Sequence, residues 1–317
     1  MERWTSLAEI APDFADTVVT IGKFDGVHLG HQRLLAESLN ISEEHSLAAV
    51  VLTFDRHPDA LLHPERVVQP ITGARQKAEL IEASGADALL TLPFDEQLAS
   101  MTADDFVAKI LVDALHARAV VVGRGFRFGA GGEGDVALLR LLGVELGFVV
   151  REVEPVLLGD CRISTTAVRE ALDAGDIAKA NAMLGRRHAV RGVIEHGKKL
   201  GRTIGFPTAN MSRSAEGYLP LDAVYAGFLT VNHDEGSITY PAALSVGKNE
   251  TFEAVPRVLE AFVLDRDDLD LYDLDVTIEF LSFVRPTLKF GSIEELISAI
   301  AADVEKVRLE IDRSVVL

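Results

Sequence analysis

The sequence predicts two domains: a doubly wound α/β domain, followed by a small antiparallel β-barrel with a helix at its C-terminal end. Three observations support this. Short β-branched runs alternate with helical patterns over the first 185 residues. From residue 188 onward, short strands are separated by Gly, Pro, Asn and Asp. Residues 293–313 then repeat apolar side chains with the period of a helix. A chain of 317 residues is long enough for two domains.

The first domain is predicted to hold a parallel sheet, because its strand candidates are apolar on both faces. These candidates are residues 17–21, 48–54, 88–92, 119–123 and 148–153. The helices expected between them are 31–39, 74–83, 103–115 and 136–142. In sheets of this kind, binding sites lie beyond the carboxyl ends of the strands.

The second domain is expected to begin at residue 186. Two short helices, 166–172 and 177–184, precede the sequence Gly-Arg-Arg at 185–187, which we interpret as a boundary between domains 1–185 and 186–317. The expected strands of the barrel are 188–195, 226–231, 240–246, 257–263 and 276–283. The helix at 293–313 is expected to pack on the barrel.

Composition narrows the class of protein. A formal net charge of −18 argues against a wide surface for nucleic acid. No apolar run is long enough for a membrane span, and the N-terminus lacks the apolar core of a secretory signal. Cys161 is the single cysteine, which excludes an intrachain disulfide and a cysteine metal site. We therefore predict a cytoplasmic protein whose partners are small molecules, with no nucleic acid or membrane partner; its oligomeric state stays open.

A first chemical motif follows the first strand directly and opens a helix. It reads GKFDGVHLGH over residues 22–31. Gly22 and Gly26 allow the backbone to bend close to a ligand. His28 and His31 are three residues apart at a helix N-terminus, so both rings can face one anion. Because no carboxylate adjoins them, stabilisation of charge is favoured over proton transfer.

A second motif, RISTTAVR at residues 162–169, combines hydroxyls with a cation. Ser164 and Thr165 can cap the next helix, and Arg169 falls one turn inside it. Hydroxyls, free backbone amides and a guanidinium that converge in this way suit a polyphosphate.

With TFDRHP at 53–58 and VGRGFRFG at 122–129, these motifs resemble the adenylyltransferase module of prokaryotic bifunctional FAD synthetases, a nucleotidylyltransferase-like fold, over about residues 15–185. The resemblance implies that FMN phosphate attacks the α-phosphorus of ATP in line and that pyrophosphate leaves. His28 and His31 would be catalytic. The implied contacts to ATP are Gly22, Phe24, His28, His31, Ser164, Thr165 and Arg169, and those to flavin are His57, Pro58, Phe126 and Phe128.

Two features of this half bear on the nucleotide and flavin sites. The family usually has Asp or Asn where this chain has Gly125, so a polar contact to nucleotide or flavin is missing. Residues 129–134 satisfy G-x-G-x-x-G but do not directly follow a strand, so we interpret them as a mobile loop over the flavin site and not as a dinucleotide fingerprint.

The second half opens with a loop rich in glycine and cations. Glycines at 197, 201 and 205, with cations at 198, 199 and 202, suit a cover over a polyphosphate. Thr208 and Asn210 follow on the same side of an extended segment and offer two oxygen ligands. Hard oxygen ligands suit the Mg²⁺ that accompanies ATP.

This segment, with LPLDAVYA at 219–226, Leu271-Tyr272 and Arg285, resembles the riboflavin kinase module over about residues 186–313. The resemblance implies a six-stranded Greek-key barrel and a glycine-rich flap. Its implied contacts are Gly197, Lys199, Gly201, Arg202 and Thr208 for ATP, Thr208 and Asn210 for Mg²⁺, and Asn210, Glu260 and Arg285 for flavin, with Glu260 as the catalytic base. This chain departs from the family at Lys248, Glu250 and Asp273.

Alternation along the strand at 258–265 puts Glu260 on the same face as Phe262 and Leu264, and we expect this face to be the buried one.

The two resemblances predict one bifunctional enzyme that phosphorylates riboflavin to FMN and adenylylates FMN to FAD, with ATP as co-substrate of both reactions. Three alternatives stay open. Because of Gly125, the chain could be a riboflavin kinase with a weakened adenylyltransferase half. It could be a flavin-binding regulator that keeps both folds without turnover, or it could transfer the nucleotide to another acceptor. The intact histidine pair favours catalysis over binding alone.

Overall fold

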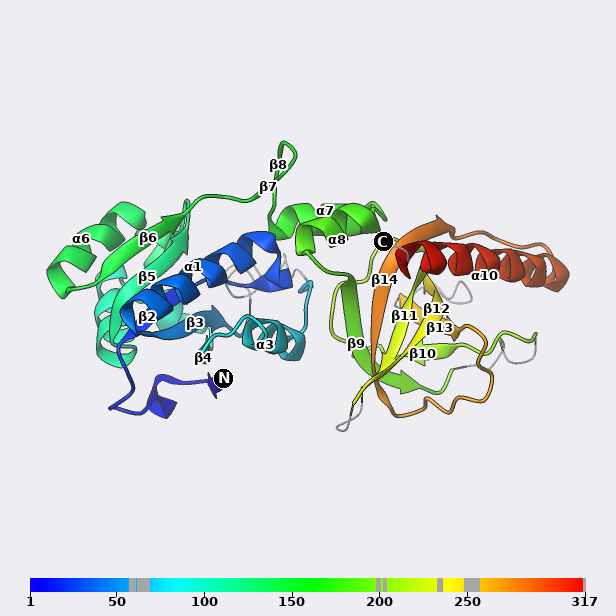
Figure 1. Ribbon diagram of the computed structural model, residues 1–317, viewed down its shortest axis with the longest axis horizontal. Coiled ribbons are helices and arrows are strands. Elements are labelled where there is room, and N and C mark those ends of the chain that lie inside the picture. Colours follow the sequence, from blue (N-terminus) through cyan, green and yellow to red (C-terminus); the bar gives the residue numbers. More distant parts are fainter. Residues whose placement is uncertain are drawn as a thin grey trace. The chain divides into compact units, whose positions relative to one another are not determined.

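The computed structural model describes residues 1–56, 61, 69–197, 201, 204–232, 236–247 and 257–315. Contacts divide the chain into two compact units, whose elements are labelled in Figure 1. The N-terminal unit contains Met1–Gln69 and Ala74–Ser164. The C-terminal unit contains Pro70–Gly73 and Thr165–Leu317.

The N-terminal unit is built on a six-stranded sheet in the order β1-β4-β3-β2-β5-β6, and every pair of neighbours is parallel. The strands are β1 (Glu2–Trp4), β2 (Thr17–Ile21), β3 (Ala48–Phe54), β4 (Ala88–Leu92), β5 (Ala117–Gly123) and β6 (Val149–Val153). All five residues of β2 are buried, as their apolar sequence predicts. Strand β1, at the edge of the sheet, was not predicted.

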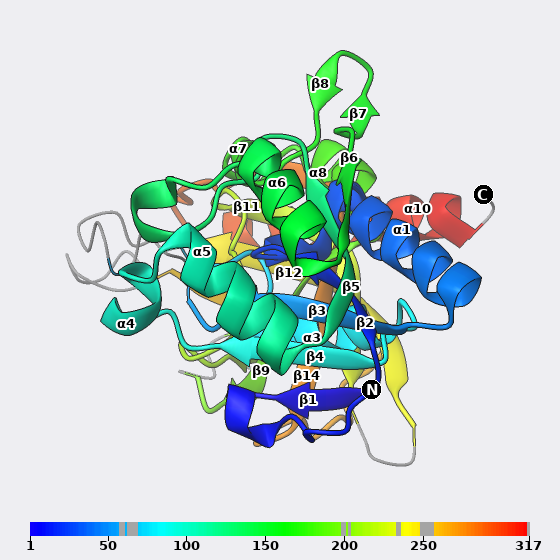
Figure 2. The same ribbon diagram turned by 90° about the vertical axis from the view of Figure 1, so that its left-hand side faces the viewer.

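Helices cover both faces of this sheet, which confirms the doubly wound prediction (Figure 2). They are α1 (Leu29–His45), α3 (Ala74–Glu82), α5 (Ala103–Asp105), which continues into the π-type helix η4 (Phe106–Ala114), and α6 (Val136–Leu146). Val19 and Ile21 of β2 pack on the side of η4 and α6. Val18 packs on the side of α1. A short hairpin, β7 (Leu157–Leu158) and β8 (Cys161–Arg162), was not predicted.

The C-terminal unit contains a closed antiparallel barrel in the order β10-β13-β12-β11-β14-β9. Its strands are β9 (His188–Glu195), β10 (Ala209–Met211), β11 (Ala223–Val231), β12 (Ile238–Gly247), β13 (Val258–Val263) and β14 (Asp275–Pro286). Strands β11, β12 and β13 are neighbours in sequence, and β14 returns to lie beside β11, which is the Greek-key arrangement. The predicted barrel is therefore confirmed.

The C-terminal helix α10 (Ile293–Val315) packs on the outside of this barrel, as predicted (Figure 1). Val304 and Val307 lie three residues apart on its buried stripe. They form an apolar cluster with Ala226 of β11 and with Leu264, which follows β13.

Helices α7 (Thr165–Asp173) and α8 (Ile177–Leu184) belong to the C-terminal unit. The backbone N–H of Leu221 donates to the carbonyl of Leu172 at 2.9 Å, and the amide of Asn181 donates to the carbonyl of Phe280 at 2.9 Å. By contact, then, these helices group with the barrel. The boundary at 185/186 stays a prediction about the two functional modules.

The segment Pro70–Gly73 also belongs to the C-terminal unit, although its sequence neighbours do not. Ile71 is fully buried there, and its carbonyl accepts the backbone N–H of Tyr218 at 3.3 Å. None of the helices in the described part of the chain is both long and apolar enough to cross a membrane.

Candidate active sites

The two histidines of the N-terminal unit are fixed by a helix cap and by stacking of their rings. His28 caps helix α1, and its Nδ1 accepts the backbone N–H of His31 at 3.3 Å. The two rings stack with centroids 3.7 Å apart and planes at 14°. The turn from β2 into this helix holds Phe24 and Val27 at positive φ, 49° and 39°. Such backbone is costly for residues other than glycine and is often found at functional sites.

Glycine at position 30 is required by this geometry, and the sequence analysis missed it. A Cβ on Gly30 would lie 2.9 Å from the ring carbon Cε1 of His28. Any other residue would therefore displace the first histidine. The predicted Gly26 has φ of 79°, and a Cβ on the predicted Gly22 would lie 3.1 Å from the ring of Phe24. Gly22 and Gly30 thus allow close approach of a ring, and Gly26 allows a positive φ.

The environment of His31 favours its neutral form. Burial, with the nearby positive charges of His28 and Lys77, holds the pKa of His31 well below its usual value. Its Nδ1 is buried with no hydrogen-bond partner among the described residues. Phe24, predicted to contact ATP, is fully buried, and its ring lies 5.1 Å from that of His31. The Phe24 side chain therefore supports His31 from the core side.

A cavity of about 730 Å³ adjoins this segment, and five phenylalanines contribute to its lining. Its lining includes Gly22, Lys23, Phe54, Phe94, Phe126 and Phe128. The cavity lies where β2 and β5 end, which is the point at which the strand order reverses. Doubly wound sheets bind ligands at such a point.

Phe126 and Phe128, both predicted to contact flavin, line this cavity with stacked rings 5.7 Å apart. Gly22, predicted to contact ATP, lines it too. The cavity has the volume and the apolar character that suit a flat ring system. His57 and Pro58, the other predicted flavin contacts, lie outside the described residues.

The glycine-rich loop 129–134 closes on itself beside the cavity. The backbones of Phe128 and Gly134 exchange hydrogen bonds of 3.1 and 2.9 Å. The carboxylate of Glu133 accepts the backbone N–H of Ala103 at 2.9 Å. Gly131 and Gly132 line the cavity, so the loop lies where the flavin site was predicted. Its mobility stays a prediction. Gly125, which replaces the Asp or Asn usual in the family, has φ of 79°, with open space where a side chain would be.

The predicted clamp on polyphosphate is divided between the two compact units. Ser164 ends the N-terminal unit, whereas Thr165 and Arg169 lie on α7 of the C-terminal unit. Arg169 follows the first residue of the helix by four positions, as the sequence predicts. Their joint contact with ATP stays a prediction.

In the barrel, the structure brings Thr208, Asn210 and Glu260 together. Asn210 of β10 is in register with Glu260 of β13. The hydroxyl of Thr208 donates to the Glu260 carboxylate at 3.5 Å, and the amide of Asn210 donates to the carbonyl of Thr208 at 3.3 Å. Burial raises the pKa of Glu260, an effect that the bond from Thr208 partly offsets.

The prediction about the buried face of this strand was wrong in one respect. Glu260 and Phe262 do share a face, but both are only half-buried. The residues directed into the barrel are Leu259, Ala261 and Val263, which are all buried. The face of Glu260 is the outer one, and Phe262 there joins the apolar cluster under α10. The carboxylate therefore lies at a partly covered edge of the barrel wall.

Two flap glycines lie directly against these polar residues. A side chain at Gly197 would overlap the amide of Asn210. One at Gly201 would overlap the carbonyl of Phe206 and approach the hydroxyl of Thr208 to 3.5 Å. Glycine thus lets the chain pass close over the predicted metal ligands. Lys199 and Arg202 lie outside the described residues, as do Lys248 and Glu250.

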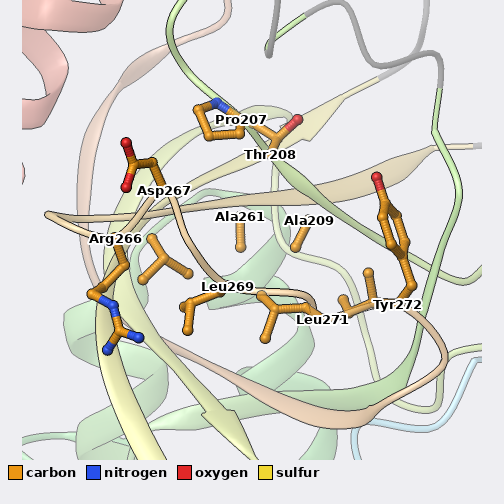
Figure 3. A pocket seen from close by; sticks show the side chains of 11 residues that line it. Pro207, Thr208, Ala209, Ala261, Arg266, Asp267, Leu269, Leu271 and Tyr272 are labelled. Carbon is orange, nitrogen blue, oxygen red and sulfur yellow. The ribbon is translucent and has the colours of Figure 1, made fainter.

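A small cavity of about 50 Å³ lies beside Thr208 (Figure 3). Pro207 and Thr208 border one side of it, and a segment from Arg266 to Tyr272 borders the other. This volume suits one or two waters and is far below the volume of a flavin site. Asp273, which stands where the family usually has glycine, follows Tyr272 and has φ of 60°, a conformation that glycine adopts easily.

Arg285, predicted to contact flavin, makes a bidentate ion pair with Asp303 of α10 through bonds of 2.8 and 2.6 Å. The side chains are only 15% and 6% exposed, so the pair ties the helix to the barrel. Asp303 was not predicted from the sequence, although it is a carboxylate next to Val304 and Val307 on the buried stripe of the helix. A flavin contact of Arg285 stays a prediction.

No group of three or more His, Cys, Asp or Glu side chains in the described ranges could hold a metal ion. The oxygen atoms of Thr208, Asn210 and Glu260 are nevertheless of the hard type that Mg²⁺ prefers, and phosphates complete such a site in kinases. These residues therefore fit a Mg²⁺ ion that arrives with ATP.

Comparison with known proteins decides the family. Residues 10–167 match the family model of FAD synthetase, and residues 184–310 match that of riboflavin kinase. A bifunctional riboflavin kinase/FMN adenylyltransferase of Escherichia coli K12 is 36% identical over 286 residues, with 90% of each chain covered. One from Pseudomonas fluorescens is 36% identical, with 97% of each chain covered. This chain belongs to the bifunctional riboflavin kinase/FMN adenylyltransferase family.

The order of the two modules and the class of enzyme predicted from the sequence are thereby confirmed. A solved structure from Streptococcus pneumoniae, described as a macrolide-efflux protein, is 31% identical and has a TM-score of 0.86. The match covers 96% of this chain and 98% of that chain, so both units share their folds with it.

The family models also locate the predicted residues. The histidine pair, Ser164 and Thr165 fall within the FAD synthetase match, whereas Arg169 lies two residues beyond its end. Every predicted kinase residue, from Gly197 to Arg285, falls within the riboflavin kinase match. As a member of this family, the protein is a transferase, and riboflavin, FMN, FAD and ATP fit its activities.

Proposed function

We propose that this protein phosphorylates riboflavin to FMN in its C-terminal unit and adenylylates FMN to FAD with its N-terminal residues, with ATP as co-substrate of both reactions. The observation that carries the kinase half is the contact of Thr208 with Glu260 at the wall of a riboflavin kinase-type barrel. The adenylyltransferase half is supported by a stacked histidine pair next to an aromatic cavity at the switch point of the sheet.

In the kinase reaction, the 5′-hydroxyl of riboflavin attacks the γ-phosphorus of ATP, and the bond to ADP breaks. Glu260 takes the hydroxyl proton, and its raised pKa makes it a stronger base than an exposed carboxylate. Thr208 and Asn210 would hold Mg²⁺, which supplies positive charge to the phosphates. Gly197, Lys199, Gly201 and Arg202 would cover ATP, and Asn210 and Arg285 would contact the flavin.

In the adenylyltransferase reaction, an oxygen of the FMN phosphate bonds to the α-phosphorus of ATP, and the bond to pyrophosphate breaks. His28 and His31 stabilise the charge of the phosphates, and Phe24 acts through the ring of His31. Gly22, Ser164, Thr165 and Arg169 complete the contacts to ATP. Phe126, Phe128, His57 and Pro58 bind the flavin ring. We also propose that the enzyme works in the cytoplasm, where the free Cys161 stays reduced.

Incubation of the purified protein with riboflavin, ATP and Mg²⁺, followed by chromatography of the flavins, tests this proposal. FMN followed by FAD is the expected result. FMN alone would select a kinase with an inactive adenylyltransferase half, and neither product would select a flavin-binding regulator. A parallel reaction with FMN as the starting flavin measures the second step alone. Chelation of Mg²⁺ should stop FMN formation, and added Mg²⁺ should restore it.

A further inference from the structure

Lys77 is a partly buried cation for which the sequence predicted no role. It lies on helix α3, and its ammonium donates to the carbonyl of Phe54 at 3.1 Å and toward the hydroxyl of Thr53 at 3.4 Å. Both acceptors belong to the carboxyl end of β3. Burial lowers the pKa of Lys77, whereas the carboxylates of Asp25 and Asp55 raise it.

This ammonium lies between the two parts of the adenylyltransferase site. On one side, Phe54 and Lys23 line the aromatic cavity, and the hydroxyl of Thr53 donates to the carbonyl of Lys23 at 3.1 Å. On the other side, the charge of Lys77 is close enough to His31 to oppose its protonation. Lys77 therefore lies where the cavity meets the histidine pair.

A cation at this place would help the two substrates of FAD formation to approach each other. FMN phosphate and ATP are both polyanions, and the first must approach the α-phosphorus of the second. If the flavin ring occupies the cavity, its phosphate must extend toward the histidines, because they contact ATP. An ammonium has three donors, and Phe54 and Thr53 account for two of them. The third can meet an oxygen of the incoming phosphate.

We propose that Lys77 binds the phosphate of FMN, the attacking group of the adenylyltransferase reaction. The proposal rests on the function proposed above. The carboxylates of Asp25 and Asp55 favour the charged form of this ammonium and so oppose the effect of its burial.

The experiment compares Lys77→Met with Lys77→Arg and with the control Lys109→Met, whose lysine is exposed and pairs with Asp105. Rates of FAD formation are measured over a range of FMN at saturating ATP, and then over a range of ATP. A charge-assisted hydrogen bond predicts a loss of about 10- to 100-fold in kcat/KM for FMN in Lys77→Met. The KM for ATP should change less than about threefold, and Lys77→Arg should recover part of the loss.

FMN formation from riboflavin in the same samples reports on the other unit and should stay at the wild-type rate. If Lys77→Met does not fold, Lys77→Gln, which keeps a donor for the Phe54 carbonyl but carries no charge, decides by the same criteria. A change within threefold, or equal losses for FMN and ATP, would overturn the proposal and make Lys77 a tether between α3 and β3. If the wild-type protein forms no FAD, the proposed adenylyltransferase function fails instead.

Discussion

The hydroxyl of Thr208 lies 3.5 Å from the carboxylate of Glu260, so the metal ligand and the base proposed for the kinase are in direct contact. This contact joins two neighbouring strands of the barrel, because Asn210 of β10 is in register with Glu260. The arrangement places the proton acceptor beside the phosphates that the metal would hold, as transfer of the γ-phosphoryl group to a hydroxyl requires.

Glu260→Gln should make FMN at least about a hundredfold more slowly, because the amide keeps the shape of the side chain but cannot take the proton. The variant should still convert supplied FMN to FAD. Because burial raises the pKa of Glu260, the wild-type kinase should lose activity on acidification at a higher pH than an exposed glutamate would give. The exposed Glu305 on α10 provides the control Glu305→Gln. FMN formation within a few-fold of wild type would exclude Glu260 as the base.

His31→Ala should lower FAD formation by about 10²- to 10³-fold, the usual effect of losing one preorganised group that stabilises charge. FMN formation should stay near normal, because the kinase residues lie in another unit. His45→Ala, at the other end of the same helix, is the matched control and should leave both rates unchanged. Both products are measured from one reaction. Equal loss of both activities in a folded His31→Ala variant would contradict the model of two sites.

Gly125→Asn should raise FAD synthesis or tighten FMN binding, by several-fold at most, since a new hydrogen bond contributes about 0.5–1.5 kcal/mol. The φ of 79° at Gly125 is one that asparagine tolerates better than most residues, and a side chain there meets open space. Gly125→Ala has a larger backbone cost and no polar group, and should give no gain. Unchanged kinetics for FMN and ATP in the asparagine variant would refute the missing contact.

Asp273→Gly should stabilise the protein by about 0.5–1 kcal/mol, because Asp273 holds φ of 60°, which glycine adopts without strain. Thermal unfolding followed by circular dichroism measures the effect. Asp265 provides a comparison, since it has φ of 59° but also pairs with Arg308 at 2.6 Å. Asp265→Gly should gain little stability, because the relief of backbone strain is offset by the loss of that ion pair. An unchanged midpoint for Asp273→Gly would show that its backbone is not strained.

His188 should make the protein less stable in acid. Burial lowers its pKa to about 4, from an ordinary value of 6.5, and its Nε2 lies 2.6 Å from the carbonyl oxygen of Tyr218. Between these two pH values the unfolded chain binds the extra proton, so the free energy of unfolding falls as the pH falls, by about 3 kcal/mol in all. Urea unfolding at pH 7 and pH 4.5 gives the free energy of unfolding at each pH. The difference between these two free energies should be smaller for His188→Gln than for the wild type. Equal differences would contradict the lowered pKa.

The sequence predicted those elements whose pattern is local and long enough. The buried strands β2 to β5 are mostly apolar runs, and α10 repeats its apolar residues over six turns. Strands β1 and β10 have three residues each, too few for any period to emerge. The histidine pair could be found because its two members are three residues apart.

The features that could not be predicted from the sequence depend on contacts between residues that are distant along the chain. Lys77 meets Phe54 across 23 positions, and Asp303 meets Arg285 across 18, with no local pattern to join them. The buried face of β13 was misjudged for a different reason. Both faces of that strand are covered, one by the barrel interior and the other in part by α10, so alternation alone cannot distinguish them.

The C-terminal unit takes four residues, Pro70–Gly73, from within the sequence of the other unit. Recombination between related genes joins two parents at one position. A crossover at 185 would give the offspring helices α7 and α8 from one parent and their barrel from the other. A crossover at 164 would keep these helices with their barrel but would still take Ile71 from the other parent. Hybrids therefore inherit a mixed C-terminal core wherever the junction lies between 73 and 165.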